Sequence, residues 1–222
     1  QKSAVHAAMS SGAVVITGGP GTGKTTIMRL VLDMFTEQKL AVSLCAPTGK
    51  AAKRLSESCG KEAKTLHRLL GVEMSEREEQ RFSKNEQNPL DCDVVIVDEM
   101  SMVDIMLFSA LLKAMRKGVR LIIAGDADQL PSVGAGNVLR DILDSEAAPA
   151  VRLSEVFRQA EESRIVVNAH RINNGEMPLG NDKAKDFFFM PRSAEGALET
   201  ICELCCSRLP AAYGFDCKSD IQ

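Results

Sequence analysis

The chain has 222 residues, a formal net charge of −3 and a hydrophobic content of 45%. These values predict a globular protein of one domain, or of one domain and part of another. No apolar run approaches the roughly 20 residues of a membrane span, and the first residues lack the pattern of a secretion signal, so we expect no membrane partner.

A phosphate-binding loop follows the first predicted strand. Residues 13–17 are a β-branched apolar run, preceded by a short amphipathic helical pattern around Ala4 and Ala8. The next stretch, Gly18-Gly19-Pro20-Gly21-Thr22-Gly23-Lys24-Thr25, fits G-x-x-x-x-G-K-[ST] at every fixed position. Apolar residues then recur at helical spacing from Ile27 to Phe35. Because the motif requires a strand before it and a helix after it, we predict a mononucleotide site rather than a chance glycine-rich turn.

The residue types of this loop suit a polyphosphate. Glycines allow successive backbone N–H groups and the helix N-terminus to face the phosphates. Lys24 is expected to reach the β- and γ-phosphates, and the Thr25 hydroxyl to bind Mg²⁺. The expected nucleotide-binding residues of the loop are Gly19, Pro20, Gly21, Thr22, Gly23, Lys24, Thr25 and Thr26.

A second strand and a basic segment come next. Residues 41–46 form an apolar run stopped by Pro47, and helices are expected at 49–58 and 63–70. Between Ala46 and Leu70 the net charge is +4. The basic residues are Lys50, Lys53, Arg54, Lys61, Lys64 and Arg68. The following residues, 72–92, are charge-rich with Phe82 as their one aromatic, and we expect an insertion outside the core, with a solvated loop slightly favoured.

Two further buried strands end in acidic loops. Residues 94–97 lead into Asp98-Glu99, and residues 119–124 lead into 125–131. Asp98 is expected to hold Mg²⁺ through its water shell, and Glu99 to orient and deprotonate the attacking water. An Asp-Glu pair is often only a solvated turn, but here it ends a buried strand in a chain with a phosphate-binding loop. Since the pair suits hydrolysis, an ATPase is favoured over a kinase.

The last third of the chain is less regular. We expect helices at 136–144 and 165–172, an edge strand at 151–153 and a strand at 187–190. Seven cysteines, an odd and scattered number, fit a reducing compartment better than a disulfide framework. Cys202-x-x-Cys205 has the spacing of metal ligands but no second Cys/His pair, so a buried helix face is favoured.

Strands that alternate with helices at this spacing predict an α/β fold with a parallel sheet covered by helices on both faces. In such sheets ligands bind beyond the carboxyl ends of the strands, where the glycine-rich and acidic loops fall.

Five stretches, in this order, resemble the motifs of superfamily 1 DNA helicases, and most closely those of the RecD-like (exodeoxyribonuclease V alpha chain) family. They are residues 18–25, 46–52, 65–70, 97–102 and 125–131; residues 153–159 resemble the family's fourth motif. The resemblance covers nearly all of residues 1–175. It implies a RecA-like P-loop NTPase fold, with the first motor domain at 1–157. Residues 158–222 would then form the connection and the truncated start of a second motor domain, and residues 72–92 would stand where the family carries a strand-separating pin.

The resemblance also implies roles for residues in the nucleotide site. Gln1 resembles the glutamine that reads adenine, Gln129 the residue that senses the γ-phosphate, and Arg158 an arginine that contacts that phosphate. Such an arginine stabilises charge in the transition state. A surface salt bridge is the alternative for Arg158.

A second set of residues resembles the motifs that grip the backbone of single-stranded DNA. It consists of Pro47, Thr48, Gly49, Lys50, Thr65, His67 and Arg68. Hydroxyls, N–H groups near helix starts and basic side chains are what phosphate contacts use. For Lys53, Arg54, Lys61 and Lys64 a solvated face is an equal alternative, and His67 could be a buried, hydrogen-bonded histidine.

The sequence thus predicts part of an ATP-dependent DNA helicase that uses ATP and Mg²⁺, acts in recombination or repair, and resides in the bacterial cytoplasm. Its partners would be single-stranded DNA or duplex ends, and it could stand alone or join a helicase–nuclease complex. An RNA-dependent ATPase of helicase fold and a nucleotide-switched interaction module of a nuclease complex stay open. A GTPase is disfavoured, because no Asn-Lys-x-Asp motif follows a strand.

Overall fold

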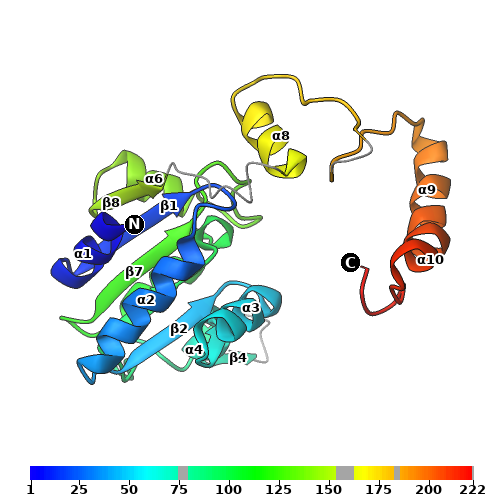
Figure 1. Cartoon of the computed structure of the whole chain (residues 1–222). Helices are drawn as coiled ribbons and strands as arrows, with labels where there is room; N and C mark the ends of the chain where they lie inside the picture. The colour runs from blue at the N-terminus through cyan, green and yellow to red at the C-terminus, as the bar shows by residue number, and fades with distance from the viewer. Residues whose placement is uncertain (75–79, 154–162, 183–185, 222) are drawn as a thin grey trace. The chain divides into compact units, whose positions relative to one another are not determined.

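The computed structural model describes residues 1–74, 80–153, 163–182 and 186–221 (Figure 1). The chain divides into two compact units, Gln1–Met177 and Pro178–Gln222. Arg158 and most of the stretch resembling the fourth motif lie outside the described residues. No helix among the described residues is long and apolar enough to cross a bilayer.

A parallel sheet forms the centre of the first unit (Figure 1). Among the described residues it has six strands in the order β3-β2-β6-β7-β1-β8, and every neighbouring pair is parallel. The strands are β1 Ala13–Gly18, β2 Val42–Ala46, β3 Ala63–Thr65, β6 Val94–Val97, β7 Arg120–Gly125 and β8 Ala150–Leu153. The predicted α/β class is confirmed, and β8 is the edge strand that the sequence indicates.

Helices cover both faces of this sheet, because its strands are apolar on both sides. Helices α1 (Lys2–Ser10), α2 (Lys24–Glu37) and α3 (Gly49–Cys59) share one core, and α4 (Leu66–Leu70), α5 (Ile105–Ala114) and α6 (Val138–Asp144) share the other. In β1, Ile16 belongs to the first core and Val15 to the second. Each fully buried aliphatic side chain of this kind contributes about 1.5–3 kcal/mol.

The parallel register brings the carboxyl ends of the central strands to one edge. Thr17 of β1 pairs with Gly125 of β7, and Val97 of β6 pairs with both Cys45 of β2 and Ile123 of β7. The loops that leave β1, β2, β6 and β7 therefore begin side by side. Most of the residues for which the sequence predicts a nucleotide-binding or DNA-binding role lie in the four segments that begin at this edge.

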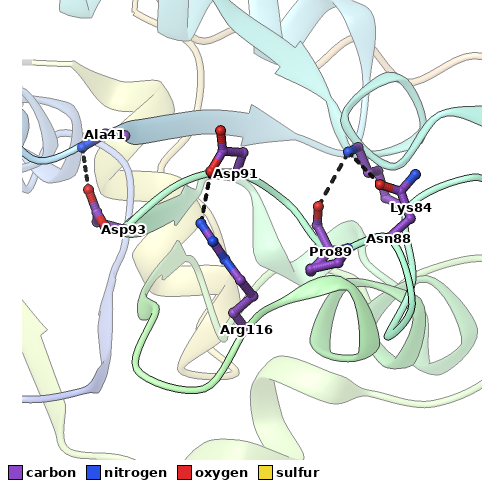
Figure 2. Close-up of polar contacts among 7 residues, drawn as sticks. All are labelled: Ala41, Lys84, Asn88, Pro89, Asp91, Asp93 and Arg116. Atoms are coloured by element: carbon purple, nitrogen blue, oxygen red, sulfur yellow. Dashed lines mark hydrogen bonds and ion pairs between the residues drawn. The ribbon is translucent and has the colours of Figure 1, made fainter.

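The insertion contains a short hairpin in place of part of the slightly favoured solvated loop, while residues 83–92 form no helix or strand. Strand β4 (Val72–Met74) pairs antiparallel with β5 (Gln80–Phe82). The chain then returns to β6 through polar contacts that Figure 2 shows. Lys84 donates to Asn88 Oδ1 (3.2 Å) and to the Pro89 carbonyl (3.3 Å). Nearer to β6, Arg116 pairs with Asp91 (2.9 Å), and the Ala41 N–H donates to Asp93 Oδ2 (2.8 Å).

Two other local predictions need correction. Residues 63–65, expected to be helical, form β3, because they pair with Leu44–Ala46 of β2. Residues 187–190 form no strand. Instead the Phe189 N–H donates to Asn181 Oδ1 (2.6 Å), and the Phe189 carbonyl accepts from Asn181 Nδ2 (2.9 Å), so one side-chain amide satisfies the backbone groups that a neighbouring strand would use.

The remaining described helices lie between residues 164 and 213. Helix α8 (Arg164–Asn173) ends the first unit, and the second unit contains α9 (Ala194–Glu203), a π-helical turn (η2, Leu204–Arg208) and α10 (Leu209–Tyr213). The buried helix face expected for the cysteines is wrong, since α9 has no buried residue and Cys202 and Cys206 are exposed.

Candidate nucleotide-binding site

The phosphate-binding loop connects the end of β1 to the start of α2. Gly21 (φ 75°) and Gly23 (φ 84°) have left-handed backbones, which glycine adopts without steric cost. Thr22 is buried, and its hydroxyl donates to the Gly19 carbonyl at 2.8 Å. No side chain of the described residues caps the start of α2. The N–H groups at the start of this helix therefore suit a bound anion.

The Lys24 ammonium group hydrogen-bonds to the backbone of this loop. Its Nζ donates to the carbonyl oxygens of Gly18 and Gly19, the latter at 3.0 Å. These bonds hold the positive charge at the mouth of the loop. A terminal phosphate would compete for the same three N–H donors.

Asp98 and Glu99 follow β6 at the same edge of the sheet. The Asp98 N–H donates to the Cys45 carbonyl (2.9 Å), which fixes the backbone at this point. The Glu99 N–H donates to Asp98 Oδ1 (2.9 Å), and Glu99 itself has a left-handed backbone (φ 53°). The pKa of Asp98 is raised to about 6, chiefly by burial and also by the Glu99 charge. The hydrogen bond from the Glu99 N–H and the charges of Lys24 and Arg54 oppose this rise.

A cavity of about 480 Å³ joins these groups. It is lined by Gly19, Pro20, Gly21, Thr22, Gly23, Lys24, Thr25, Thr26, Ala51, Arg54, Leu55, Asp98, Glu99 and Gln129. The volume lies in the range of small-molecule sites. Residues separated by more than 100 positions thus face one space. The Thr25 hydroxyl and the Asp98 carboxylate on its wall are oxygen donors of the kind that Mg²⁺ prefers.

Arg54 is a cavity residue that the sequence does not single out. The sequence predicts a solvated face or a DNA contact for Arg54, but this α3 side chain lines the nucleotide cavity while remaining exposed. Its charge lowers the pKa of Asp98 against the effect of burial. One sequence signal could have indicated this role. Arg54 lies one turn after Lys50 on a helix that starts at the edge where the carboxyl ends of the central strands meet.

Gln129 reaches the cavity from the loop after β7. Its N–H donates to the Asp126 carbonyl (3.3 Å), and its Oε1 accepts from the Ser101 hydroxyl (3.5 Å). Ser101 belongs to the turn η1 (Met100–Met102) that directly follows Glu99. The Ala127 N–H donates to Thr17 Oγ1 (3.3 Å), so the loop is also tied to β1.

Gln1 lies beside the phosphate cavity rather than in its wall. It lines a second cavity of about 480 Å³ between α1 and α2. The other lining residues are Lys2, Val5, His6, Met9, Thr26, Ile27, Leu30 and Met34. Thr26 lines both cavities, so the two spaces adjoin at the first turn of α2.

The residues expected to contact DNA follow β2 and β3. Thr48 and Thr65 are helix N-caps, since their hydroxyls accept from the Ala51 N–H and the Arg68 N–H respectively, both at 3.2 Å. Pro47 is half-buried, and Gly49, Lys50 and Arg68 are exposed.

His67 is half-buried rather than buried, and its ring centroid lies 6.0 Å from that of Phe82. Both rings line a cavity of about 620 Å³.

The cysteines give no sign of a metal centre. All seven thiols are free, and no group of three His, Cys, Asp or Glu side chains among the described residues could hold an ion.

Comparison with known proteins identifies the family. The profile of the AAA domain matches residues 1–188. The ATP-dependent RecD2 DNA helicase of Deinococcus radiodurans is 46% identical over 170 residues, which cover 77% of this chain and 23% of that protein. The RecBCD enzyme subunit RecD of Mycobacterium tuberculosis is 40% identical over 207 residues, which cover 81% of this chain and 35% of that subunit. The chain therefore spans about a quarter to a third of the length of these relatives.

A solved structure supports the fold. Pif1 of Bacteroides sp., determined in complex with ADP-AlF4, has a TM-score of 0.56 and 21% identity, and the match covers 90% of this chain and 54% of that one. The resemblance to RecD-like helicases is confirmed, and the chain belongs to the AAA domain family.

Proposed function

We propose that this chain is the ATP-hydrolysing part of an ATP-dependent DNA helicase. The observation that carries the proposal is the single cavity shared by Lys24, Asp98, Glu99 and Gln129. The relatives point the same way, since one is named an ATP-dependent DNA helicase and the Pif1 structure contains ADP-AlF4.

The cavity residues divide the chemistry of hydrolysis between them. Lys24 exchanges the Gly18 and Gly19 carbonyls for the β- and γ-phosphates. Thr25 and Asp98 would hold Mg²⁺, which would neutralise charge on the phosphates. Glu99 takes a proton from the attacking water, and Arg54 adds a positive charge to the lining of the cavity. Gln1 contacts the adenine from the adjoining cavity, and Arg158 contacts the γ-phosphate.

Coupling to DNA runs through Gln129. Its contact with Ser101 joins the loop after β7 to the turn that follows Glu99. Loss of the γ-phosphate would therefore shift both loops at once. Thr48, Lys50, Thr65, His67 and Arg68, at the ends of the neighbouring strands, grip single-stranded DNA in our proposal.

The larger context follows from the relatives. We place the first motor domain at 1–157 and the connection to the second at 158–222, and we assign the hairpin within 72–92 as the strand-separating pin. Single-stranded DNA or duplex ends, and other subunits of a helicase–nuclease complex, are the partners proposed from the RecD relatives. The free cysteines support the bacterial cytoplasm as the compartment.

The test is ATP hydrolysis by the longest available form of the protein, with and without single-stranded oligonucleotides. We expect hydrolysis that DNA stimulates at least tenfold, and none above background for Lys24→Ala. If RNA but not DNA stimulates hydrolysis, the proposed DNA helicase function is wrong and an RNA-dependent ATPase takes its place. Nucleotide binding without stimulated hydrolysis would leave only the interaction module.

A further inference from the structure

His170 of helix α8 lies directly against Gly19 of the phosphate-binding loop. A methyl group added at Gly19 would meet His170 Cε1 at 2.9 Å, Nε2 at 3.5 Å and Nδ1 at 3.9 Å. These three ring atoms are its nearest neighbours. The imidazole therefore occupies the space that any side chain at position 19 would need.

This contact, and not a positive φ angle, favours glycine at position 19. Gly21 and Gly23 have positive φ angles, whereas Gly19 does not. Gly19 therefore lacks the left-handed φ that disfavours other residues. The ring of His170 is thus what excludes a larger residue from this part of the loop.

The histidine reaches Gly19 at a cost in hydrogen bonding. Its Nε2 is buried and has no hydrogen-bond partner among the described residues. A buried polar atom without a partner is uncommon in native proteins and is found at functional sites. The opposite side of Gly19 is held by the site itself, because its carbonyl accepts from Lys24 Nζ (3.0 Å) and from the Thr22 hydroxyl (2.8 Å).

Local contacts hold both ends of helix α8. Its N-cap Ser163 accepts from the Val166 N–H (3.3 Å), and Asn168 is fully buried. At the other end, Arg171 donates to the Met177 carbonyl (2.8 Å) and pairs with Glu176 (3.0 Å). These local bonds keep the helix intact, so in our proposal a displacement of the ring acts on the helix as a unit.

We propose that His170 is a positioning residue of the nucleotide site, which seats α8 on Gly19 and couples that helix to occupancy of the phosphate-binding loop. Nucleotide binding draws Lys24 away from the Gly19 carbonyl and so alters the surface on which His170 rests. Because coupling between two sites is reciprocal, changes in α8 must also change nucleotide affinity. The inference rests on the proposed nucleotide site but not on helicase activity.

The first experiment measures nucleotide affinity in a double-mutant cycle, with a fluorescent ADP analogue as the probe. Gly19→Ala should weaken binding about tenfold, because overpacking against a ring forces the loop to shift. Gly19→Ala combined with His170→Ala should bind at least threefold more tightly than Gly19→Ala alone. Gly12→Ala, where the added methyl meets nothing within 4 Å, is the matched control and should bind normally. If the losses of nucleotide affinity in the two single variants multiply in the double variant, the proposal is overturned.

The second experiment measures the reciprocal effect by amide hydrogen exchange. ADP should slow exchange in Arg164–Asn173 of the unmodified chain at least threefold. The same nucleotide should protect the phosphate-binding loop of His170→Ala but leave exchange in its α8 unchanged. A response of α8 that persists in His170→Ala would show that the helix senses nucleotide by another route.

These readouts separate the inference from the proposed function. A chain that binds nucleotide but lacks DNA-stimulated hydrolysis still gives a result in both experiments. A chain whose hydrolysis is normal, but whose α8 ignores nucleotide, would refute only the role of His170.

Discussion

The Glu99 main-chain N–H donates to Asp98 Oδ1 at 2.9 Å, while the Glu99 backbone itself is left-handed (φ 53°, ψ 42°). A glutamate rarely adopts this conformation, and such residues are concentrated at functional sites. The hydrogen bond orients one carboxylate, and the unusual backbone sets the direction of the other. One peptide unit thereby fixes both acidic groups at the mouth of the cavity.

This arrangement predicts a selective loss in Glu99→Gln. The substitution keeps the N–H that Asp98 accepts and nearly the same shape, but it removes the proposed base. ATP turnover should fall by about 100-fold or more, with nucleotide affinity changed less than about threefold. Steady-state hydrolysis and nucleotide titration measure the two quantities. Glu57→Gln, at an exposed position of α3, is the control; turnover within fivefold of normal in Glu99→Gln would exclude Glu99 as the base.

The raised pKa of Asp98 predicts a pH-dependent gain in stability for Asp98→Asn. Folding raises this pKa from 3.8 to about 6, so the folded state binds the proton more tightly than the unfolded state. The stabilisation from this group is complete below pH 3.8 and is lost as the pH rises through about 6. At pH 7.5 Asp98→Asn should therefore be more stable than the unmodified chain, by at most about 3 kcal/mol.

Urea unfolding in the absence of nucleotide and Mg²⁺ at pH 7.5 and pH 4.5 measures this difference. The gain should be clearly smaller at pH 4.5, where the folded Asp98 is mostly protonated. Asp144→Asn, at the exposed end of α6, should show no comparable change between the two pH values. An equal gain at both pH values would trace the effect to packing instead of charge.

Much of the catalytic edge could be predicted from the sequence, because its elements are strong local signals. The buried run at 94–97 and the glycine-rich loop after 13–17 specify parallel strands whose carboxyl ends must meet. Lys24 and Asp98 could be assigned to one site without knowledge of any contact between them. Their convergence follows from topology alone.

The features that the sequence did not reveal depend on tertiary contacts. Residues 63–65 become a strand only because β2 offers them a partner, and three residues are too few for a periodic pattern. Arg54 and His170 are ordinary basic residues on helices, and their roles emerge where those helices meet the phosphate-binding loop. The backbone N–H and carbonyl of Phe189 are hydrogen-bonded by the side chain of Asn181. A strand pattern in the sequence does not predict such a contact.

The capping role of Thr48 predicts that stability and DNA binding can be separated at this residue. Thr48→Ala removes the acceptor for the Ala51 N–H and should cost about 1 kcal/mol of folding free energy. Thr48→Asn and Thr48→Asp both retain a capping oxygen and should stay within about 0.5 kcal/mol of the unmodified chain. Only Thr48→Asp adds a negative charge at the proposed DNA phosphate contact, so it should weaken single-stranded DNA binding about tenfold.

Urea unfolding and fluorescence anisotropy of a labelled oligonucleotide at two salt concentrations measure these effects. The weakening in Thr48→Asp should shrink at the higher salt concentration, since it is electrostatic. If Thr48→Asp binds DNA as tightly as Thr48→Asn, the DNA path does not pass this helix N-terminus. Thr48 would then be a structural cap alone.

The cysteines should divide into two reactivity classes under native conditions. Burial raises the pKa of the thiols of Cys45, Cys59 and Cys92, while Cys202 and Cys217 are exposed. Because the thiolate is the reacting species, and buried thiols must wait for local opening, the first three should react with a maleimide about 100-fold or more slowly. Mass spectrometry of peptides after timed labelling at pH 7 checks this, and labelling in urea should make the rates equal. Native labelling of Cys45 as fast as that of Cys217 would contradict the packing of β2 against β6, where the Cys45 thiol donates to the Ile96 carbonyl at 3.4 Å.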